Sequence, residues 1–411
     1  MRHTCSPRWN GPVSSVLPTP ADVIERSGGS NREGSSLATV SWGAPSAQER
    51  GPIVTGSGSE RNAIGIHAGA FAPYRAISIA TGALDEGHRP DLTHTKPSAT
   101  IGPFPQWAQP GKIVALDPWG HRVADDHADL ISEGWQIQPS IAVTEGRLEM
   151  PEIASALQAG HLQADGRILD SRGGMNVTKI AIDPTWWLPG IANRLGLSEP
   201  ALRAALVNTS GGMYPDLLAR PDIKVFLPPI GGTSVYLFGD PTRLGDSTTP
   251  IACRIHDECN GSDVFGSDMC TCRPYLAFAA EECVRTAQER GVGVIVYNRK
   301  EGRALGEVVK YLVYNARRGS GDVADGYFAR TEEIAGVQDM RCQSLAVDVL
   351  HWLGISRIDR WLSMSHLKRK AVAEGGIEIG NQIELPTDRI AAGAEVEISA
   401  KISAGYFTEP R

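Results

Sequence analysis

The chain lacks paired cysteines, long apolar runs and a leader segment, and each absence excludes a class of protein. Four of the seven cysteines, Cys5, Cys253, Cys283 and Cys342, are scattered without paired spacing among 411 residues, so no disulfide framework is visible. No apolar run approaches the roughly 20 residues of a transmembrane helix, and no charged-then-apolar segment opens the sequence. The sequence therefore predicts a soluble protein of a reducing cytoplasm, with no membrane contact.

Basic residues are also in the minority. Lys and Arg number 40 against 47 Asp and Glu, which gives a formal charge of -7 and a pI near 5.8. Binding to a nucleic-acid backbone needs clustered Lys and Arg, so this balance argues against nucleic acid as a partner. A small molecule is the expected ligand, and the length allows two or three domains.

Composition divides the chain into four parts. Residues 1–60 are rich in Ser, Gly, Pro and Arg, which predicts an extended or disordered arm. Residues 61–230 are expected to form a separate N-terminal domain, residues 231–390 a second domain, and residues 391–411 a tail. In the second domain, we expect helices over residues 274–290, 301–318, 338–353 and 366–373, and strands over residues 292–297, 358–362 and 377–385. This alternation predicts a mixed α/β fold on a sheet that is at least partly parallel.

Three thiols in the second domain indicate a metal site. The segment Arg254-Ile-His-Asp-Glu-Cys259 is followed by Cys270-Thr-Cys272, so the thiols lie near a histidine and two carboxylates. Thiolates bind Zn²⁺ at about 2.3 Å, and three protein ligands leave one position for water, which is typical of a catalytic zinc. The pattern therefore favours hydrolytic chemistry over the alternative that these cysteines are buried small apolar residues.

A structural zinc is the main alternative, and it would need a fourth ligand. His256 or Cys253 could supply one. If the segment is a strand, however, alternation places the odd-numbered residues on one face, and His256 then points away from Cys259. This argument favours the open, catalytic site.

Four ordered motifs over residues 251–386 resemble those of GTP cyclohydrolase II. Arg254-Ile-His-Asp-Glu-Cys259 is similar to that family's Arg-Val-His-Ser-Glu-Cys segment. Asp263-Val-Phe-Gly-Ser267 with Cys270-Thr-Cys272 matches its aspartate-containing turn and Cys-Asp-Cys pair. Lys300-Glu-Gly-Arg-Ala-Leu-Gly306 resembles its Gln-Glu-Gly-Arg-Gly-Ile-Gly loop, and Asp339-Met-Arg341 takes the place of its Asp-x-Arg pair. The resemblance implies a GTP cyclohydrolase II-like catalytic domain with Cys259, Cys270 and Cys272 as zinc ligands.

The same resemblance implies roles for further residues. Zinc-bound water would attack a carbon of a heteroaromatic ring, with Asp339 as proton acceptor and Glu258 as a second candidate near the metal. Arg341 would engage the substrate phosphate; we interpret it as an anion-binding guanidinium rather than a nucleophile, because Arg is almost always protonated. The implied substrate-binding residues are Arg254, His256, Tyr275, Glu301, Gly302, Arg303, Ser363 and Lys368. For Lys368, within Lys368-Arg369-Lys370, a solvated surface position is the alternative.

Several departures from the family pattern fall among the residues that would read the base. Tyr275 stands where the family has a glutamine, and Ser363-Met-Ser-His366 replaces a Thr-Asn-Asn-Pro element. The stretch Asp325-Gly-Tyr-Phe-Ala-Arg330 has no clear equivalent of a nucleotide-contacting threonine. A site built to hydrogen-bond one base rejects another by leaving polar groups unpaired. Because the residues that would contact the base differ while the three zinc-binding cysteines are kept, the sequence predicts that the enzyme acts on a different base.

The N-terminal extension indicates which base this is. Its segment Ile113-Val-Ala-Leu-Asp-Pro-Trp-Gly-His121 resembles the extension on GTP cyclohydrolase II-like proteins of a uracil catabolic pathway. The expected substrate is then UMP, whose uracil ring would be opened hydrolytically, with Tyr275, Tyr327 or Phe328 stacking on the base. The alternatives are a GTP cyclohydrolase II that releases formate, and a non-catalytic, zinc-stabilised nucleotide sensor. The resemblance also implies a homodimer.

Overall fold

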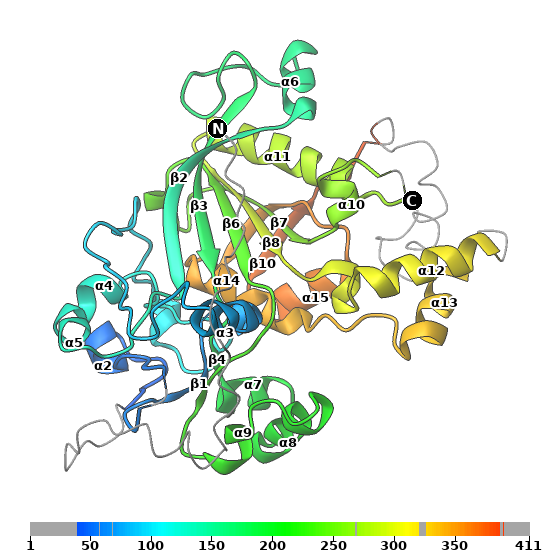
Figure 1. Ribbon diagram of the computed structural model, residues 1–411. Coiled ribbons are helices and arrows are strands. Elements are labelled where there is room, and N and C mark those ends of the chain that lie inside the picture. Colours follow the sequence, from blue (N-terminus) through cyan, green and yellow to red (C-terminus); the bar gives the residue numbers. More distant parts are fainter. Residues whose placement is uncertain are drawn as a thin grey trace.

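A seven-stranded mixed sheet organises the chain. The computed structural model describes residues 39–56, 58–67, 69–267, 269–319, 326–386 and 389. The strand order is β10-β9-β7-β8-β6-β3-β2 (Figure 1). The strands are β2 Ile141–Glu149, β3 Gly174–Ile182, β6 Thr233–Phe238, β7 Ile251–Asp257, β8 Val292–Asn298, β9 Arg357–Trp361 and β10 Glu378–Gln382. A small second sheet joins β1 Ala63–Gly65, β5 Val225–Leu227 and β4 Trp186–Trp187.

One half of the large sheet is parallel and the other antiparallel. Strand β7 pairs in parallel with β8 and with β9, and β9 pairs in parallel with β10. From β8 outward, β6, β3 and β2 follow as antiparallel neighbours. Parallel strands that are covered on both faces tend to be apolar along their length, as in β8, where the first five residues are all buried. The predicted α/β fold with a partly parallel sheet is confirmed.

Helices cover both faces of the parallel half. The helices are α2 Ala47–Arg50, α3 Ala72–Ala80, α4 Val123–Asp126, α5 Ala128–Ser132, α6 Pro151–Gln158, α7 Leu188–Arg194, α8 Glu199–Thr209, α9 Asp216–Ala219, α10 Asn260–Asp263, α11 Cys272–Gln288, α12 Glu307–Gly319, α13 Gly326–Ala335, α14 Val347–Trp352 and α15 His366–Glu374. Helix α11 buries Ala280 and Val284 against one face of the sheet, with Ala252 of β7. Helix α14 buries Leu350 on the other face, with Cys253. Neighbouring residues of β7 therefore enter opposite cores, as the period of a strand requires.

The large sheet contains strands from both sides of the predicted domain boundary at residue 230. Strands β2 and β3 precede that position, and β3 pairs with β6, which follows it. Ile180 of β3 and Val235 of β6 belong to the same core cluster. The N-terminal part thus supplies two strands to the sheet that carries the second part, and a boundary near residue 230 stays a prediction.

Two predicted helices are shorter than expected. The helix over residues 301–318 is wrong at its start, because Gly302 and Arg303 adopt left-handed φ angles of 59° and 58°. A short turn, η4 Glu301–Ala304, therefore precedes α12. The helix over residues 338–353 contracts to α14 and a turn, η5 Gln343–Leu345. There the side chain of Asp339 accepts the Arg341 backbone N–H at 2.9 Å, a local bond that competes with helix formation.

Part of the predicted N-terminal arm, residues 39–56, contacts the rest of the fold, whereas residues 1–38 and the tail over residues 391–411 lie outside the described residues. Trp42 donates from Nε1 to the Ile113 carbonyl at 2.6 Å, and Val54 is 1% exposed. Arg50, also buried, lies 3.0 Å from Asp117. A few apolar and paired residues are enough to fix this Ser- and Gly-rich stretch onto the fold.

Three further turns complete the backbone, η1 Gly69–Phe71, η2 Pro105–Ala108 and η3 Pro241–Arg243. Within the described part of the chain, no helix has both the length and the apolar character needed to cross a bilayer.

Candidate functional site

The pocket lies where the parallel strands end. Asp257 closes β7 and Asn298 closes β8, while Ser363 lies two residues after the end of β9. Because these three strands run in parallel, their carboxyl ends share one edge of the sheet, where α/β proteins place their ligands. The chain after β7 carries Cys259 and the chain after β8 carries Glu301, and both line the same pocket.

Three thiols converge at this edge. The Sγ atoms of Cys259, Cys270 and Cys272 all lie within 4.8 Å of one another, and Cys259 Sγ is 2.9 Å from Cys270 Sγ. Cys259 and Cys270 are buried, and Cys272 is half-buried. Hydrogen bonds from Cys270 and then Cys272, together with burial, raise the pKa of Cys259. This donor set fits a thiolate-binding metal such as Zn²⁺.

Neither proposed fourth ligand joins the thiols. Among the described residues, the metal-competent group contains Cys259, Cys270 and Cys272 alone. Cys253 is fully buried in the sheet core. His256 donates from Nε2 to Asp263 Oδ2 at 3.0 Å, because its Nδ1 accepts from Arg254 Nε at 3.1 Å. The structure therefore offers no support for a four-ligand structural zinc within the part of the chain that it describes.

A hydrogen-bond network instead connects His256 to Cys259. Asp263 Oδ2 accepts the Cys259 backbone N–H at 3.0 Å and the Tyr297 hydroxyl at 2.8 Å, in addition to His256. Strand β7 ends at Asp257, so its alternation stops before Cys259. Through Asp263, His256 is therefore linked to the backbone of the loop that carries Cys259.

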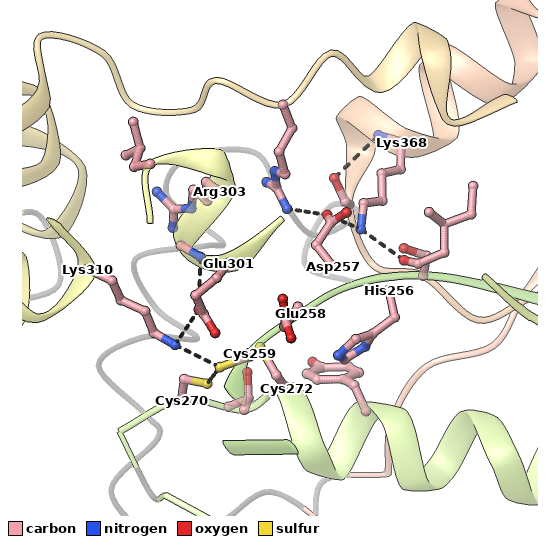
Figure 2. A pocket seen from close by; sticks show the side chains of 18 of the residues that line it. His256, Asp257, Glu258, Cys259, Cys270, Cys272, Glu301, Arg303, Lys310 and Lys368 are labelled. Atoms are coloured by element: carbon pink, nitrogen blue, oxygen red, sulfur yellow. Dashed lines mark hydrogen bonds and ion pairs between the residues drawn. The ribbon is translucent and has the colours of Figure 1, made fainter. Parts of the chain in front are cut away.

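Lys310 is a site residue that the sequence reasoning missed. From α12 it donates to Cys259 Sγ and to Glu301 Oε1, each at 2.9 Å (Figure 2). Burial alone would lower the pKa of Lys310, but the Cys259 sulfur and Glu301 raise it, so the side chain stays an ammonium. A lysine on an amphipathic helix is usually solvated. The one feature of the sequence that could have indicated a role for Lys310 is its position shortly after the Glu301 loop.

A second charge cluster surrounds Asp257. Its Oδ2 accepts from Arg341 Nη1 at 2.6 Å and from Lys368 Nζ at 2.7 Å, and its Oδ1 accepts from Asn298 Nδ2 at 3.2 Å. Burial would raise the pKa of Asp257, but Lys368 and Arg341 hold it well below its usual range. The solvated-surface alternative for Lys368 is wrong: the residue is 6% exposed, and burial lowers its pKa to about 8 although Asp257 opposes the shift.

Carboxylates occupy the space between the thiols and this cluster. Glu258 lines the pocket, and burial followed by the nearby Glu301 charge raises the pKa of Glu258. Glu301 also accepts the Asn260 backbone N–H at 2.6 Å. Asp339 does not line the pocket; both of its oxygens are engaged by the Arg341 guanidinium. The structure therefore places Glu258, and not Asp339, at the surface of the pocket.

The pocket brings together all of the other metal-binding, catalytic and substrate-binding residues predicted from the sequence, apart from the alternative stacking residues Tyr327 and Phe328. Its open space, including the part that faces solvent, is about 1070 Å³. Lining it are Cys259, Cys270, Cys272, Arg254, His256, Glu258, Tyr275, Glu301, Gly302, Arg303, Arg341, Ser363 and Lys368. Figure 2 shows Lys310, Glu301 and the thiols on one side and Asp257 with Lys368 on another. The arrangement combines a soft metal site with fixed polar groups inside one concave pocket.

Of the aromatic residues predicted to stack on the base, Tyr275 lines the pocket, whereas Phe328 packs against Val313 and Tyr314. Tyr275 is 8% exposed, and the Arg254 guanidinium lies 5.6 Å from the centre of its ring. The Arg303 guanidinium lies 4.4 Å from the centre of the Phe328 ring. The side chain of Tyr327 and the whole of Asp325 are outside the described residues.

Comparisons with known proteins agree with this geometry. Residues 25–209 match the family described as GTP cyclohydrolase N terminal, and residues 233–384 match GTP cyclohydrolase II. The chain is 51% identical over 377 residues to Uracil-regulated protein 1 of Schizosaccharomyces pombe, covering 90% of this chain and 86% of that protein. A Lachancea kluyveri protein, URC1, provisionally named a GTP cyclohydrolase, is 50% identical over 382 residues, 92% of this chain and 86% of its own. GTP cyclohydrolase-2 of Hahella chejuensis is 30% identical over 146 residues, 36% of this chain and 66% of that protein.

Proposed function

The chain belongs to the GTP cyclohydrolase II family, hydrolases that act on C–N bonds of cyclic amidines, and from this we propose that it opens the uracil ring of UMP in a zinc-dependent hydrolysis. One observation carries the proposal: the three thiols, Glu258 and Tyr275, which stands where the family has a glutamine, line a single pocket. The name of the Schizosaccharomyces pombe relative, which ties that protein to uracil, supports the choice of base.

The thiols of Cys259, Cys270 and Cys272 would hold Zn²⁺. When bound, Zn²⁺ supplies Lewis acidity and lowers the pKa of a water toward neutrality. Lys310 donates to Cys259 Sγ and so spreads the negative charge of the thiolates. Asp263 keeps the Cys259 backbone in place through a bond of 3.0 Å. These contacts prepare a rigid ligand set before substrate enters.

Proton transfer falls to Glu258 in this geometry. Hydrolysis of a ring amide adds water to the carbonyl carbon, breaks the C–N bond and needs a proton on the departing nitrogen. Glu258 lines the pocket, and its raised pKa suits a carboxyl group that accepts the proton from water and returns it to nitrogen. Asp339, the acceptor implied by the resemblance, would first have to release the Arg341 guanidinium.

Base and phosphate would be held by different residues. Tyr275 offers an aromatic ring to a pyrimidine, as aromatic side chains commonly do. Arg303 lies beside Gly302 in the loop after β8, and a guanidinium matches phosphate oxygens, so we assign the phosphate to Arg303. Arg341, to which the resemblance assigned it, donates to Asp257 and Asp339. As part of the same proposal, the enzyme acts as a homodimer in the cytoplasm.

Ring opening of GTP is the competing function, because the thiols alone do not determine which base is bound. The name of the Lachancea kluyveri relative also describes a GTP cyclohydrolase. Zinc-loaded protein incubated separately with UMP, uracil, uridine and GTP decides between them. We expect loss of pyrimidine absorbance with UMP alone; turnover of GTP with formate release, and none of UMP, would refute the proposal. The non-catalytic sensor is set aside, because the family consists of hydrolases.

A further inference from the structure

The Asp257 cluster carries an inference that rests on the proposed function and extends it. We propose that Asp257 and Lys368 read the lactam edge of the substrate base, that is, a ring N–H beside a ring C=O. Asp257 would accept the N–H, and Lys368 would donate to the carbonyl oxygen. Their polar atoms lie 2.7 Å apart and both residues line the pocket. Figure 2 shows both side chains within the pocket wall.

Hydrogen-bond capacity supports this assignment. A carboxylate offers about four acceptor positions, and Asp257 uses three, for Arg341, Lys368 and Asn298. An ammonium has three donors, and Lys368 uses two, for Asp257 and the Ile255 carbonyl. One acceptor therefore remains beside one donor. That pair is complementary to a lactam, in which a donor and an acceptor occupy adjacent ring positions.

The charge of the cluster argues for a neutral group and against phosphate. Asp257 neutralises one positive charge of the pair formed by Lys368 and Arg341, and Asp339 neutralises the other through its contacts with Arg341. The four side chains together carry no net charge. A phosphate placed here would meet the carboxylate of Asp257, whereas a lactam brings no charge and satisfies both remaining positions.

The consequence is a defined substrate class. Uracil and guanine both carry a lactam, whereas cytosine offers an unprotonated ring nitrogen beside an amino group, with donor and acceptor exchanged. Cytosine would therefore place its ring nitrogen against the Asp257 carboxylate and its amino group against the Lys368 ammonium. Discrimination between uracil and guanine would fall to other residues, among them Tyr275.

Methylated nucleotides test the assignment on the zinc-loaded, unaltered enzyme. We would measure the KM of UMP and the inhibition constants of 3-methyluridine 5′-monophosphate and CMP, since methylation replaces the ring N–H donor by a methyl group and leaves both ring carbonyls in place. A hydrogen bond to a charged acceptor predicts that the methylated nucleotide binds about 10- to 100-fold more weakly than UMP. Equal binding of the two would overturn the role of Asp257 while leaving UMP turnover intact.

Two variants extend the test. In Asp257→Ser the ratio between 3-methyluridine 5′-monophosphate and UMP should fall to about 3-fold or less, because the carboxylate acceptor is gone. Asp222→Ser, which removes an acidic partner of Arg220 outside the pocket, should keep the ratio of the unaltered enzyme. A ratio that stays high in Asp257→Ser would also overturn the assignment; if that variant does not fold, the unaltered enzyme still decides.

The proposed function can fail independently. If the enzyme turns over GTP and not UMP, the same comparison is made between GTP and 1-methylguanosine 5′-triphosphate. A loss of about 10- to 100-fold on methylation would support lactam reading although UMP is not the substrate. Equal binding, or binding of neither nucleotide, would overturn it.

Discussion

Asp348 fastens the N-terminal part of the chain to the helix that covers the parallel sheet. Its carboxylate is fully buried in α14, and Oδ2 accepts the backbone N–H groups of Val114 and Ala115 at 2.7 and 2.6 Å. Oδ1 pairs with Arg194 of α7. Arg194 in turn donates to the Lys112 carbonyl at 3.0 Å. One side chain thus joins three segments that are far apart in the sequence.

Asp348→Asn should lower the free energy of unfolding by about 3 kcal/mol. The amide oxygen can keep the two backbone donors, but the new amino group then faces the Arg194 guanidinium. Breaking a buried ion pair by removing one partner costs about 3–5 kcal/mol. The lower end applies, because Arg194 is 18% exposed on its side chain and keeps its carbonyl partners.

Urea unfolding followed by tryptophan fluorescence measures this loss, because Trp352 lies in the same helix. The control is Asp222→Asn, whose partner Arg220 is 31% exposed, and which should cost less than about 1 kcal/mol. Hydrogen exchange at the Val114 and Ala115 amides should accelerate in Asp348→Asn alone. A loss below about 1 kcal/mol with unchanged exchange would show that the ion pair does not fasten the two parts.

Four further outcomes are expected. Cys272→Ser should lose bound zinc in elemental analysis while Cys342→Ser keeps it, because only the former is in the thiol group. Burial lowers the pKa of His121 to about 4, so the native state binds fewer protons than the unfolded one between about pH 4 and 6.5; the free energy of unfolding should therefore decrease as pH is lowered through that window, and should decrease less in His121→Gln. With the pKa of Lys368 lowered to about 8, kcat/KM should decline above that pH, and Lys368→Arg should shift the decline upward. Tyr275→Ala should weaken UMP affinity about 10-fold; unchanged affinity would count against stacking.

Local sequence patterns predicted helices and strands well where the pattern favoured a single type of structure. The strand over residues 292–297 and the helix over residues 366–373 are confirmed as β8 and α15. The prediction of a helix over residues 301–318 was wrong at its start, because the residues after Gly302 are good helix formers although the chain makes a turn there. Arg303 adopts a left-handed conformation that is uncommon for residues other than glycine. Composition cannot predict such a turn, because tertiary contacts stabilise it.

The same distinction applies to the site. The thiols could be recognised in the sequence because Cys270 and Cys272 are close to Cys259 along the chain, and clustered cysteines are typical of zinc sites. Lys310 and Asp257 could not. Their roles depend on contacts with Cys259 and Lys368, made by segments that only the folded sheet brings together.

The topology explains how the chemistry could persist while the base changes. The chain after β7 supplies Cys259 and the start of α11 supplies Cys272, whereas Ser363 and Lys368 come from the chain after β9. Substitutions after β9 should therefore change the residues that contact the base without moving the thiols, because the sheet positions the ends of β7 and β9 separately. Asp257 closes β7, and its side chain pairs with that of Lys368, so it joins the segment that follows β7 to the segment that follows β9. A change of base should require compatible residues at positions 257 and 368 together, and the two side chains should behave as a coupled pair in a double-mutant cycle.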